Sequence, residues 1–240
     1  MIIVFLIAIF IFLCIFAFVT CNGIQSYVIE SALKPGPTIL ILATTHGNEP
    51  AGFYALHRFI DSNPMLKSGK VIIIPSVNTC GRIANTRNMP LGDYDINRNY
   101  LSDTFLNREI LKFVKDADWV IDLHEGWGFA KRDSGSIGSG IYPGNTRDAI
   151  NISDRVIKNI NMSMSMTMSR VDEYKKFSTM ELSNIPGSLR DICNNLNKNY
   201  ILVETSGIND IQPKELRIKQ QLYIIKNIVD KTVGLERMIN

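Results

Sequence analysis

Four short apolar segments alternate with helical segments along the chain, and this alternation constrains the fold most. Each apolar segment is bounded by polar or turn residues, as are the central strands of a sheet that is covered on both faces. The predicted strands are 38–44 (TILILAT), 71–75 (VIIIP), 119–123 (WVIDL) and 200–204 (YILVE). The predicted helices are 49–60, 103–114, 146–160 and 213–233. Strands that alternate with helices predict an α/β layer fold.

The N-terminal segment, residues 1–19, is apolar without interruption. As a helix that rises 1.5 Å per residue it would span roughly 28 Å, about the hydrocarbon thickness of a bilayer. Since no Lys or Arg precedes the segment, the pattern favours an uncleaved membrane anchor over a cleaved signal, and both over a lipoprotein signal at Cys21. We therefore expect a transmembrane anchor or signal segment over residues 1–23 and one globular domain over residues 24–240.

The charge of the chain argues against a nucleic-acid partner. The net charge is only +3, and the sequence contains no long basic run. Basic patches interleaved with aromatic residues are typical of nucleic-acid-binding surfaces, and no such stripe is present. We expect no nucleic acid among the partners.

Residues 162–169 alternate between methionine and a hydroxyl residue, Met-Ser-Met-Ser-Met-Thr-Met-Ser. Strict alternation of period two suits a half-buried strand. Methionines gathered on one strand face more often fill a core than bind copper. This segment is therefore predicted to be a strand.

Two of the three histidines, His46 and His124, lie at the ends of predicted buried strands, where ligands gather in open α/β sheets. Glu49 lies three residues after His46, and side chains at i and i+3 share one face where a turn opens into a helix. An imidazole and a carboxylate so placed can bind one zinc ion, with His124 as a third ligand. The alternative is that His46 and Glu49 only cap a helix. His57, inside a predicted helix, is expected to be a structural or surface histidine.

Four motifs occur in one order within about residues 38–207. They are Thr45-His46-Gly47-Asn48-Glu49, Asp95-Ile96-Asn97-Arg98, Asp122-Leu123-His124 and Val203-Glu204-Thr205. In that order they resemble the metal-binding, substrate-binding, third-ligand and catalytic-glutamate motifs of the zinc carboxypeptidase and succinylglutamate desuccinylase/aspartoacylase superfamily. The resemblance implies a single α/β domain, with a mixed central β-sheet flanked by helices, that hydrolyses amide bonds with zinc.

The resemblance also implies roles for residues at the metal. His46, Glu49 and His124 would hold one Zn²⁺ per chain. Zinc polarises a carbonyl and lowers the pKa of its water. Glu204 would take the proton of the water and pass it to the leaving nitrogen.

A second group of residues would contact the substrate. Arg87 stands ten residues before Asn97, where the family places an arginine that stabilises an oxyanion, and Arg82 is its rival. Asn97 and Arg98 would bind a substrate carboxylate, a task that suits the planar guanidinium. Asp95 would accept a hydrogen bond from His46 and fix its tautomer.

Several further residues stay open as candidates for the cleft. The glycine-rich segment 126–144 could form a loop that lines it. Glu125 could face the cleft or be a solvated loop residue, and Arg190 could contact substrate. The tyrosine that family carboxypeptidases carry on a mobile loop could be Tyr142 or Tyr174.

The most specific function that these motifs imply is a carboxypeptidase-type metallopeptidase that acts beside a free carboxylate. Relatives of the aspartoacylase type often carry an extra β domain after the catalytic glutamate. Residues 205–240 look helical instead, so we expect an open cleft and a peptide substrate. The alternative is a deacylase of N-acyl amino acids, and a less favoured one is a catalytically dead, membrane-tethered binding module. The catalytic domain is expected outside the cytosol, anchored or secreted.

Overall fold

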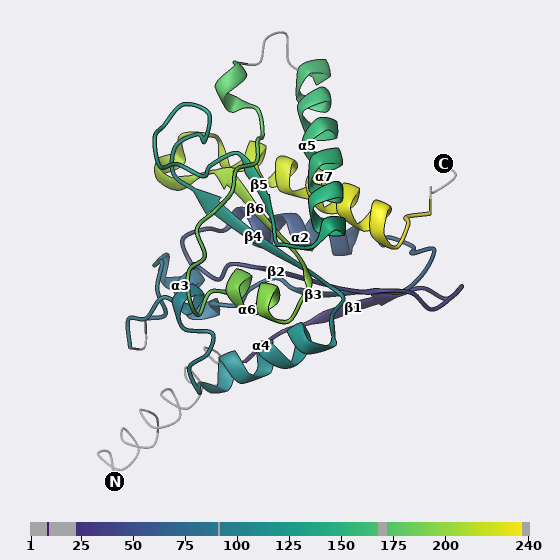
Figure 1. Ribbon diagram of the computed structural model, residues 1–240. Coiled ribbons are helices and arrows are strands. Elements are labelled where there is room, and N and C mark those ends of the chain that lie inside the picture. Colours follow the sequence, from purple (N-terminus) through teal and green to yellow (C-terminus); the bar gives the residue numbers. More distant parts are fainter. Residues whose placement is uncertain (1–8, 10–22, 91, 168–171, 237–240) are drawn as a thin grey trace.

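The computed structural model describes Ile9 and residues 23–90, 92–167 and 172–236. Within this part of the chain six strands form one sheet, in the order β1-β3-β2-β4-β6-β5 (Figure 1). The strands are β1 (Tyr27–Glu30), β2 (Thr38–Ala43), β3 (Lys70–Ile74), β4 (Trp119–Gly126), β5 (Gly140–Pro143) and β6 (Asn199–Ser206). The four central strands run parallel, and the edge strands β1 and β5 run antiparallel to their neighbours. The expected mixed sheet in a single α/β domain is confirmed.

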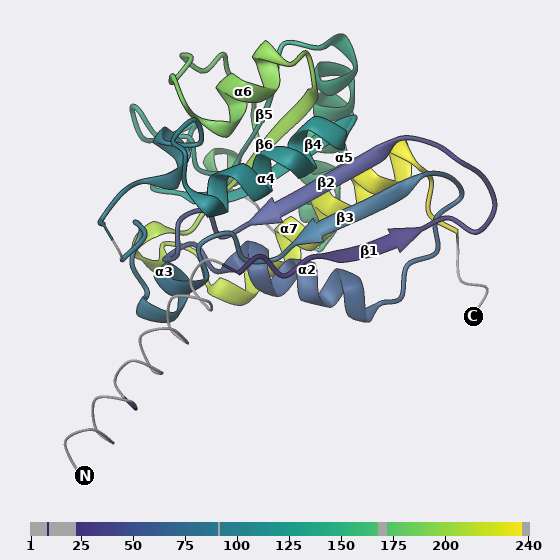
Figure 2. The ribbon, with the colours of Figure 1, turned by 90° about the horizontal axis from the view of Figure 1, so that it is seen from below.

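Helices cover both faces of the sheet (Figures 1 and 2). The α-helices are α2 (Ala51–Asp61), α3 (Thr79–Ala84), α4 (Phe105–Asp116), α5 (Arg147–Thr167), α6 (Leu189–Asn195) and α7 (Lys214–Thr232). The 3₁₀ turns among the described residues are η1 (Ile96–Arg98), η2 (Glu173–Lys175) and η3 (Ile208–Asp210). Helices α2, α5 and α7 pack on one face, and α4 and α6 lie on the other.

The alternation of side chains along each strand divides the core in two. Ile121 and Leu123 of β4 join the core under α2, α5 and α7, whereas Val120 joins the core under α4 and α6. Because successive side chains of a strand point to opposite faces, His124 shares the α4/α6 face with Val120, and Glu125 points to the α2/α7 face. The strand pattern therefore fixes which side of the sheet each polar residue at its carboxyl end can reach.

The four predicted strands and four predicted helices are all present, with small shifts at their ends except in α5, which was expected to end at residue 160 and continues to Thr167. The expected strand over residues 162–169 is wrong, because 162–167 continue helix α5 and the last two residues lie outside the described part. Side chains two apart on a helix point in nearly opposite directions. Accordingly Met164 is buried while Met162 and Met166 are exposed, so the methionines do not share one face.

The N-terminal apolar segment of residues 1–19 lies, apart from Ile9, outside the described residues. The division into an N-terminal segment and a globular domain beginning at residue 24 therefore stays a prediction. Among the helices that the structure describes, none has the length and apolar character needed to cross a membrane.

Candidate metal centre

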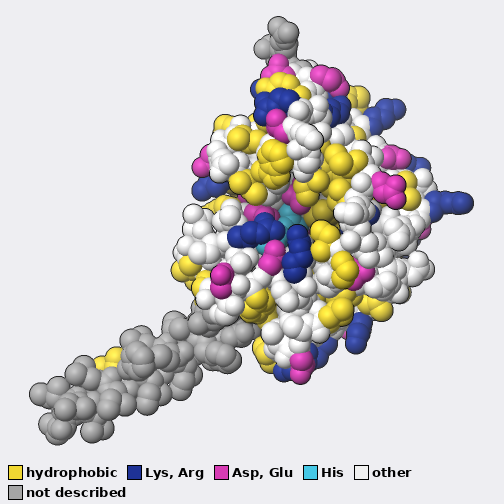
Figure 3. All heavy atoms as spheres, turned by 60° about the vertical axis from the view of Figure 1, so that its left-hand side comes forward, with side chains coloured by type: hydrophobic (Ala, Val, Ile, Leu, Met, Phe, Trp, Pro, Cys, Tyr) yellow, Lys and Arg dark blue, Asp and Glu magenta, His cyan; other side chains and the backbone are white. Residues whose placement is uncertain are grey.

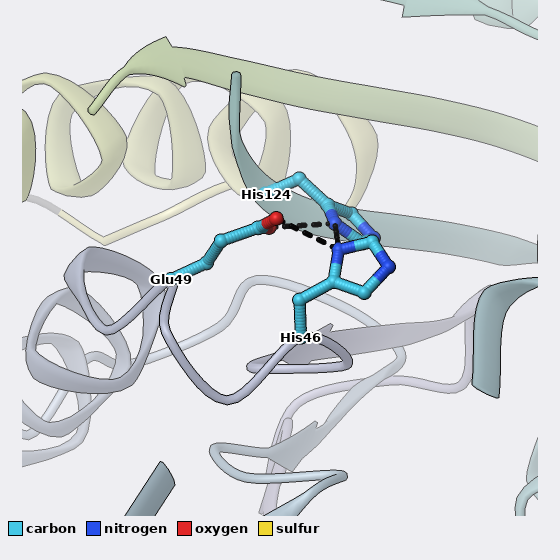
Figure 4. A group of neighbouring side chains, drawn as sticks. All are labelled: His46, Glu49 and His124. Atoms are coloured by element: carbon cyan, nitrogen blue, oxygen red, sulfur yellow. Dashed lines mark hydrogen bonds and ion pairs between the residues drawn. The ribbon is translucent and has the colours of Figure 1, made fainter. Parts of the chain in front are cut away.

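His46, Glu49 and His124 converge at the carboxyl ends of strands β2 and β4 (Figure 4). Nδ1 of His46 lies 2.7 Å from Glu49 Oε1, and Nδ1 of His124 lies 2.8 Å from Glu49 Oε2. The two Nδ1 atoms are 3.1 Å apart. All three side chains are buried. The three predicted ligands therefore offer donor atoms to one point.

The chemistry of this donor set fits a metal ion. Two imidazoles and one carboxylate are ligands that zinc accepts, at bond lengths of about 2.0–2.2 Å, which place neighbouring ligands of a tetrahedral ion about 3.3–3.6 Å apart. The observed separations are slightly shorter, so small outward rotations of the side chains would admit an ion. Three ligands also leave a fourth position for water or substrate.

A carboxylate stands behind each histidine. Nε2 of His46 lies 3.1 Å from Asp95 Oδ1, as expected, and Nε2 of His124 lies 3.1 Å from Asp122 Oδ1. Tyr200 donates a hydrogen bond to the other oxygen of Asp122. The hydrogen bond to Asp95 favours the His46 tautomer that carries its proton on Nε2, which leaves Nδ1 free for a metal. The contact between His124 and Asp122 is an ion pair without hydrogen-bond geometry. Asp122 was not among the predicted site residues, although its spacing of two from His124 on a strand signals a shared face.

These carboxylates also set the charges of the centre. Burial would raise the pKa of Glu49, but His46 and His124 hold it well below its usual value, so this carboxylate stays ionised. Burial would likewise raise the pKa of Asp95, and His46 and Arg87 lower it. Burial would lower the pKa of His124, but Asp122 and Glu49 raise it well above its ordinary value. The two carboxylates beside His124 therefore favour positive charge at this imidazole.

Glu204 lies on the neighbouring strand β6, opposite His124 in the register of the two strands. Its side chain is buried, and its Oε2 has no hydrogen-bond partner among the described residues. Burial, with Glu49 and Asp122 nearby, raises the pKa of Glu204 well above its usual value, although His124 and Arg87 oppose the shift. A carboxyl with a raised pKa and a free oxygen suits proton transfer.

A cavity of about 320 Å³ opens over these residues. Figure 3 shows histidine side chains at the bottom of a hollow, beside acidic and basic side chains. The cavity is lined by every residue that the sequence placed in the site: His46, Glu49, Arg87, Asn97, Arg98, His124 and Glu204. A larger hollow of about 440 Å³ lies along the loop after β1, and no histidine lines it.

The two predicted arginines differ in their partners. Arg87 donates to Glu49 Oε1 and Asp95 Oδ2, each at 3.2 Å. Arg98 donates to the carbonyl of Asn97 and forms no ion pair with any carboxylate that the structure describes. The rival Arg82 stacks over the ring of Phe53, 4.1 Å from its centroid, and does not line the cavity. The geometry thus favours Arg87 over Arg82.

Asn97 is the middle residue of the short η1 turn and is held by two hydrogen bonds. Oδ1 of Asp95 accepts from the Asn97 N–H at 2.8 Å, and Oδ1 of Asn97 accepts from the Leu189 N–H at 3.1 Å. Its side-chain NH₂ donates to no group among the described residues, and Asn97 lines the cavity. Arg190 also lines the cavity, where it donates to the carbonyl of Leu182.

The structure also places Glu125, Tyr142 and Tyr174, the other residues that the sequence left as candidates for the cleft. Glu125 is buried, not a solvated loop residue, and it belongs to the cavity lining. Its carboxylate points to the α2/α7 face and binds Arg217, and burial raises its pKa to about 7. Tyr142 is buried and donates to the carbonyl of Ile137. Tyr174 packs against Phe129. Neither tyrosine lines the cavity.

The glycine-rich segment 126–144 is only partly a loop. Its last residues form β5, and an expectation based on glycine content missed this strand. Gly126, Trp127, Gly135 and Ile137 of the segment line the cavity, as expected of a loop beside the site.

The amino-acid sequence is similar to one known protein family and to one characterised enzyme. Residues 35–225 match the family described as Succinylglutamate desuccinylase/Aspartoacylase catalytic domain. The chain is also 32% identical over 100 residues to the N-alpha-acetyl-L-2,4-diaminobutyric acid deacetylase of Halomonas elongata. That similarity covers 38% of this chain and 29% of the deacetylase.

Solved structures share the fold. Product-bound Csd4, a cell shape determinant protein of Helicobacter pylori, superposes with a TM-score of 0.73 at 17% identity, over 91% of this chain and 57% of Csd4. The ectoine utilization protein EutE (DoeB) of Ruegeria pomeroyi superposes with a TM-score of 0.60 at 17% identity, over 90% of this chain and 62% of that protein. The chain thus spans less than two thirds of the length of each of these relatives.

Proposed function

The chain belongs to the succinylglutamate desuccinylase/aspartoacylase family, and from this premise we propose that it is a zinc-dependent hydrolase of the carboxypeptidase type. It would cleave an amide bond next to a free carboxylate. The observation that carries the proposal is the convergence of His46, Glu49 and His124 in one cavity with Glu204. Their buried nitrogen and oxygen donors suit one zinc ion per chain.

Zinc, when bound, would supply Lewis acidity to the substrate carbonyl and make water more acidic. Glu204 would accept the proton of the attacking water through its unpartnered Oε2 and then deliver it to the leaving nitrogen. The raised pKa of Glu204 favours the second half of this task, since a protonated carboxyl is needed there. Asp95 and Asp122 would hold the histidines in place.

Positive charge on the cavity wall supports a substrate that carries a carboxylate. Arg98 forms no ion pair within the described part of the chain, so its guanidinium can bind an anion in bidentate fashion. The NH₂ group of Asn97 would add a second contact. Arg87, already fixed by two carboxylates, would face the negative charge that develops on the carbonyl oxygen.

A deacylase of N-acyl amino acids is the second candidate function. The similarity to a deacetylase of an N-acetylated diamino acid supports it. Such a substrate also has an amide beside a carboxylate, so the same residues would serve. Csd4 is described as a D,L-carboxypeptidase, with structures bound to a tripeptide and to mDAP. This similarity supports the first candidate, a carboxypeptidase that acts on peptides. A binding module without activity is less favoured, because His46, Glu49, His124 and Glu204 are all present.

The experiment that tests the proposal is a substrate panel with zinc-loaded and zinc-stripped protein. The panel contains peptides with a free C-terminus, murein peptides and N-acyl amino acids. Zinc-dependent cleavage of peptides supports the carboxypeptidase, and cleavage of N-acyl amino acids alone supports the deacylase. No cleavage of any amide, combined with tight peptide binding, would favour the binding module.

We also propose that residues 1–19 attach the chain to a membrane, with the catalytic domain outside the cytosol, or direct its secretion. The uninterrupted apolar sequence supports this location.

A further inference from the structure

Directly behind the candidate metal centre, on the α2/α7 face of the sheet, Glu125 and Arg217 form an ion pair. Oε2 of Glu125 lies 2.6 Å from Nη1 of Arg217, and the two side chains are 1% and 4% exposed. Glu125 follows His124 on β4, and Arg217 lies on α7. The pair is therefore attached to a strand that carries a candidate ligand.

Glu125 holds the segment that carries a second ligand. Its backbone N–H donates to Oε2 of Glu49 at 3.0 Å. Its side-chain Oε1 accepts from the N–H of Ala51, the first residue of α2, at 2.7 Å. Through these two bonds the backbone and the side chain of Glu125 together fix Glu49 relative to His124.

Arg217 holds the loop that follows Glu204. Its Nη1 donates to the carbonyl of Gly207 at 2.7 Å, and its Nη2 donates to Asp210 at 2.9 Å. The N–H of Gly207 in turn donates to the carbonyl of Gly126 at 2.9 Å. The loop is thus fixed on both sides just after the strand that bears the proposed catalytic glutamate.

Gly207 makes room for the ion pair. A Cβ atom at this position would lie 2.0 Å from Oε2 of Glu125 and 2.5 Å from Nη1 of Arg217. Any side chain there would displace the pair, so the approach of the two ions depends on glycine at this position.

A buried ion pair is a weak source of stability, because both ions must be removed from water and neutral replacements are often equally stable. Its directed hydrogen bonds nevertheless fix position, which a planar guanidinium with several donors does well. We propose that the Glu125–Arg217 ion pair is a positioning device of the metal centre. It holds Glu49 in position relative to His124, and it holds the Gly207 loop in position relative to Glu204. This inference rests on the proposed zinc hydrolase function.

The test compares two double variants of the full chain. In Glu125→Gln/Arg217→Met the glutamine keeps an acceptor for Ala51, while both charges and the link to Gly207 are lost. The control is Arg58→Met/Glu215→Gln, which removes an exposed pair, 2.7 Å apart, that joins α2 to α7. Zinc affinity is measured by competition with a chelator, and the thermal midpoint is measured on the metal-free protein.

We expect the first double variant to lose about 10- to 100-fold in zinc affinity, as for other residues that orient metal ligands, with little change in thermal midpoint. Its kcat should fall as well, whereas the control should match the wild type in both. Arg217→Lys, which keeps the charge but not the planar fork, should lie between the two.

The two hypotheses fail in different ways. Wild-type zinc affinity and kcat in Glu125→Gln/Arg217→Met would overturn the positioning role. The positioning role would also be overturned if zinc affinity fell only together with a large fall in thermal midpoint, both in Glu125→Gln/Arg217→Met and in Arg217→Lys. A wild-type chain that binds no zinc would instead overturn the proposed function itself.

Discussion

His124 and Glu204 stand opposite each other in the register of β4 and β6, the two parallel strands whose carboxyl ends form the floor of the cavity. Both side chains point to the α4/α6 face of the sheet. A candidate metal ligand and a candidate proton carrier are therefore held side by side on rigid strands. Such support keeps reacting groups in position better than a flexible loop does.

The first prediction concerns the metal. We expect about one zinc per chain in the purified protein, because three buried donors meet at one point. His46→Ala or His124→Ala leaves two ligands and should remove most of the zinc. Elemental analysis measures the content, with His57→Ala as the control, since His57 lies on α2 outside the cavity. Full zinc occupancy in both ligand variants would contradict the assignment.

The second prediction concerns Arg98. Arg98→Ala should lower kcat/KM by a factor equivalent to about 2–4 kcal/mol of transition-state stabilisation, because a substrate carboxylate would lose its charge-assisted partner. Arg108→Ala, which removes an exposed arginine from α4, is the matched control and should change little. Steady-state kinetics on substrates with a free or an amidated carboxylate provide the readout. Equal wild-type rates on the two kinds of substrate would rule out this role.

The third prediction concerns pH and the metal-free chain. The pKa of Glu204 is raised in the folded state, so the folded chain binds more protons than the unfolded chain above the unfolded pKa. The contribution of Glu204 to stability is thus complete below the unfolded pKa and is lost as pH rises through the folded pKa. Glu204→Gln does not titrate and should gain stability relative to wild type as pH rises from about 4.5. Urea unfolding at several pH values measures the difference, and a difference independent of pH would contradict the raised pKa.

The fourth prediction concerns location. The full chain should sediment with membranes and resist a carbonate wash, because residues 1–19 are uninterrupted apolar sequence. Replacing two central residues of this segment, Phe10→Lys and Phe12→Lys, should release the chain, since charges are costly in the bilayer centre. An intact full-length chain in the washed soluble fraction would contradict the anchor.

Much of the fold could be predicted because its central strands are covered on both faces. Burial on both sides requires largely apolar segments such as 39–43 and 71–74, which are easy to recognise. The edge strands β1 and β5 have no such signature. β1 is only half-buried, and β5 contains Gly140 and Pro143 inside a glycine-rich segment.

The site could be predicted where chemistry and spacing coincide, as in His46 and Glu49. Asp122 was missed as a site residue although it lies two residues before His124 on the same strand, because an aspartate inside an apolar segment does not show by itself which group its carboxylate contacts. Glu125 remained ambiguous for a related reason. Its partner Arg217 lies far along the chain, and no local pattern links the two.

The most direct test of the account compares Glu204→Gln with the wild type at equal zinc content. Glutamine keeps the shape of the side chain but cannot accept the proton of water. The account predicts that kcat falls by about 10²–10⁴-fold on the best amide substrate, with KM and zinc content near wild type. A variant that turns over at the wild-type rate would remove Glu204 from the mechanism and contradict the account.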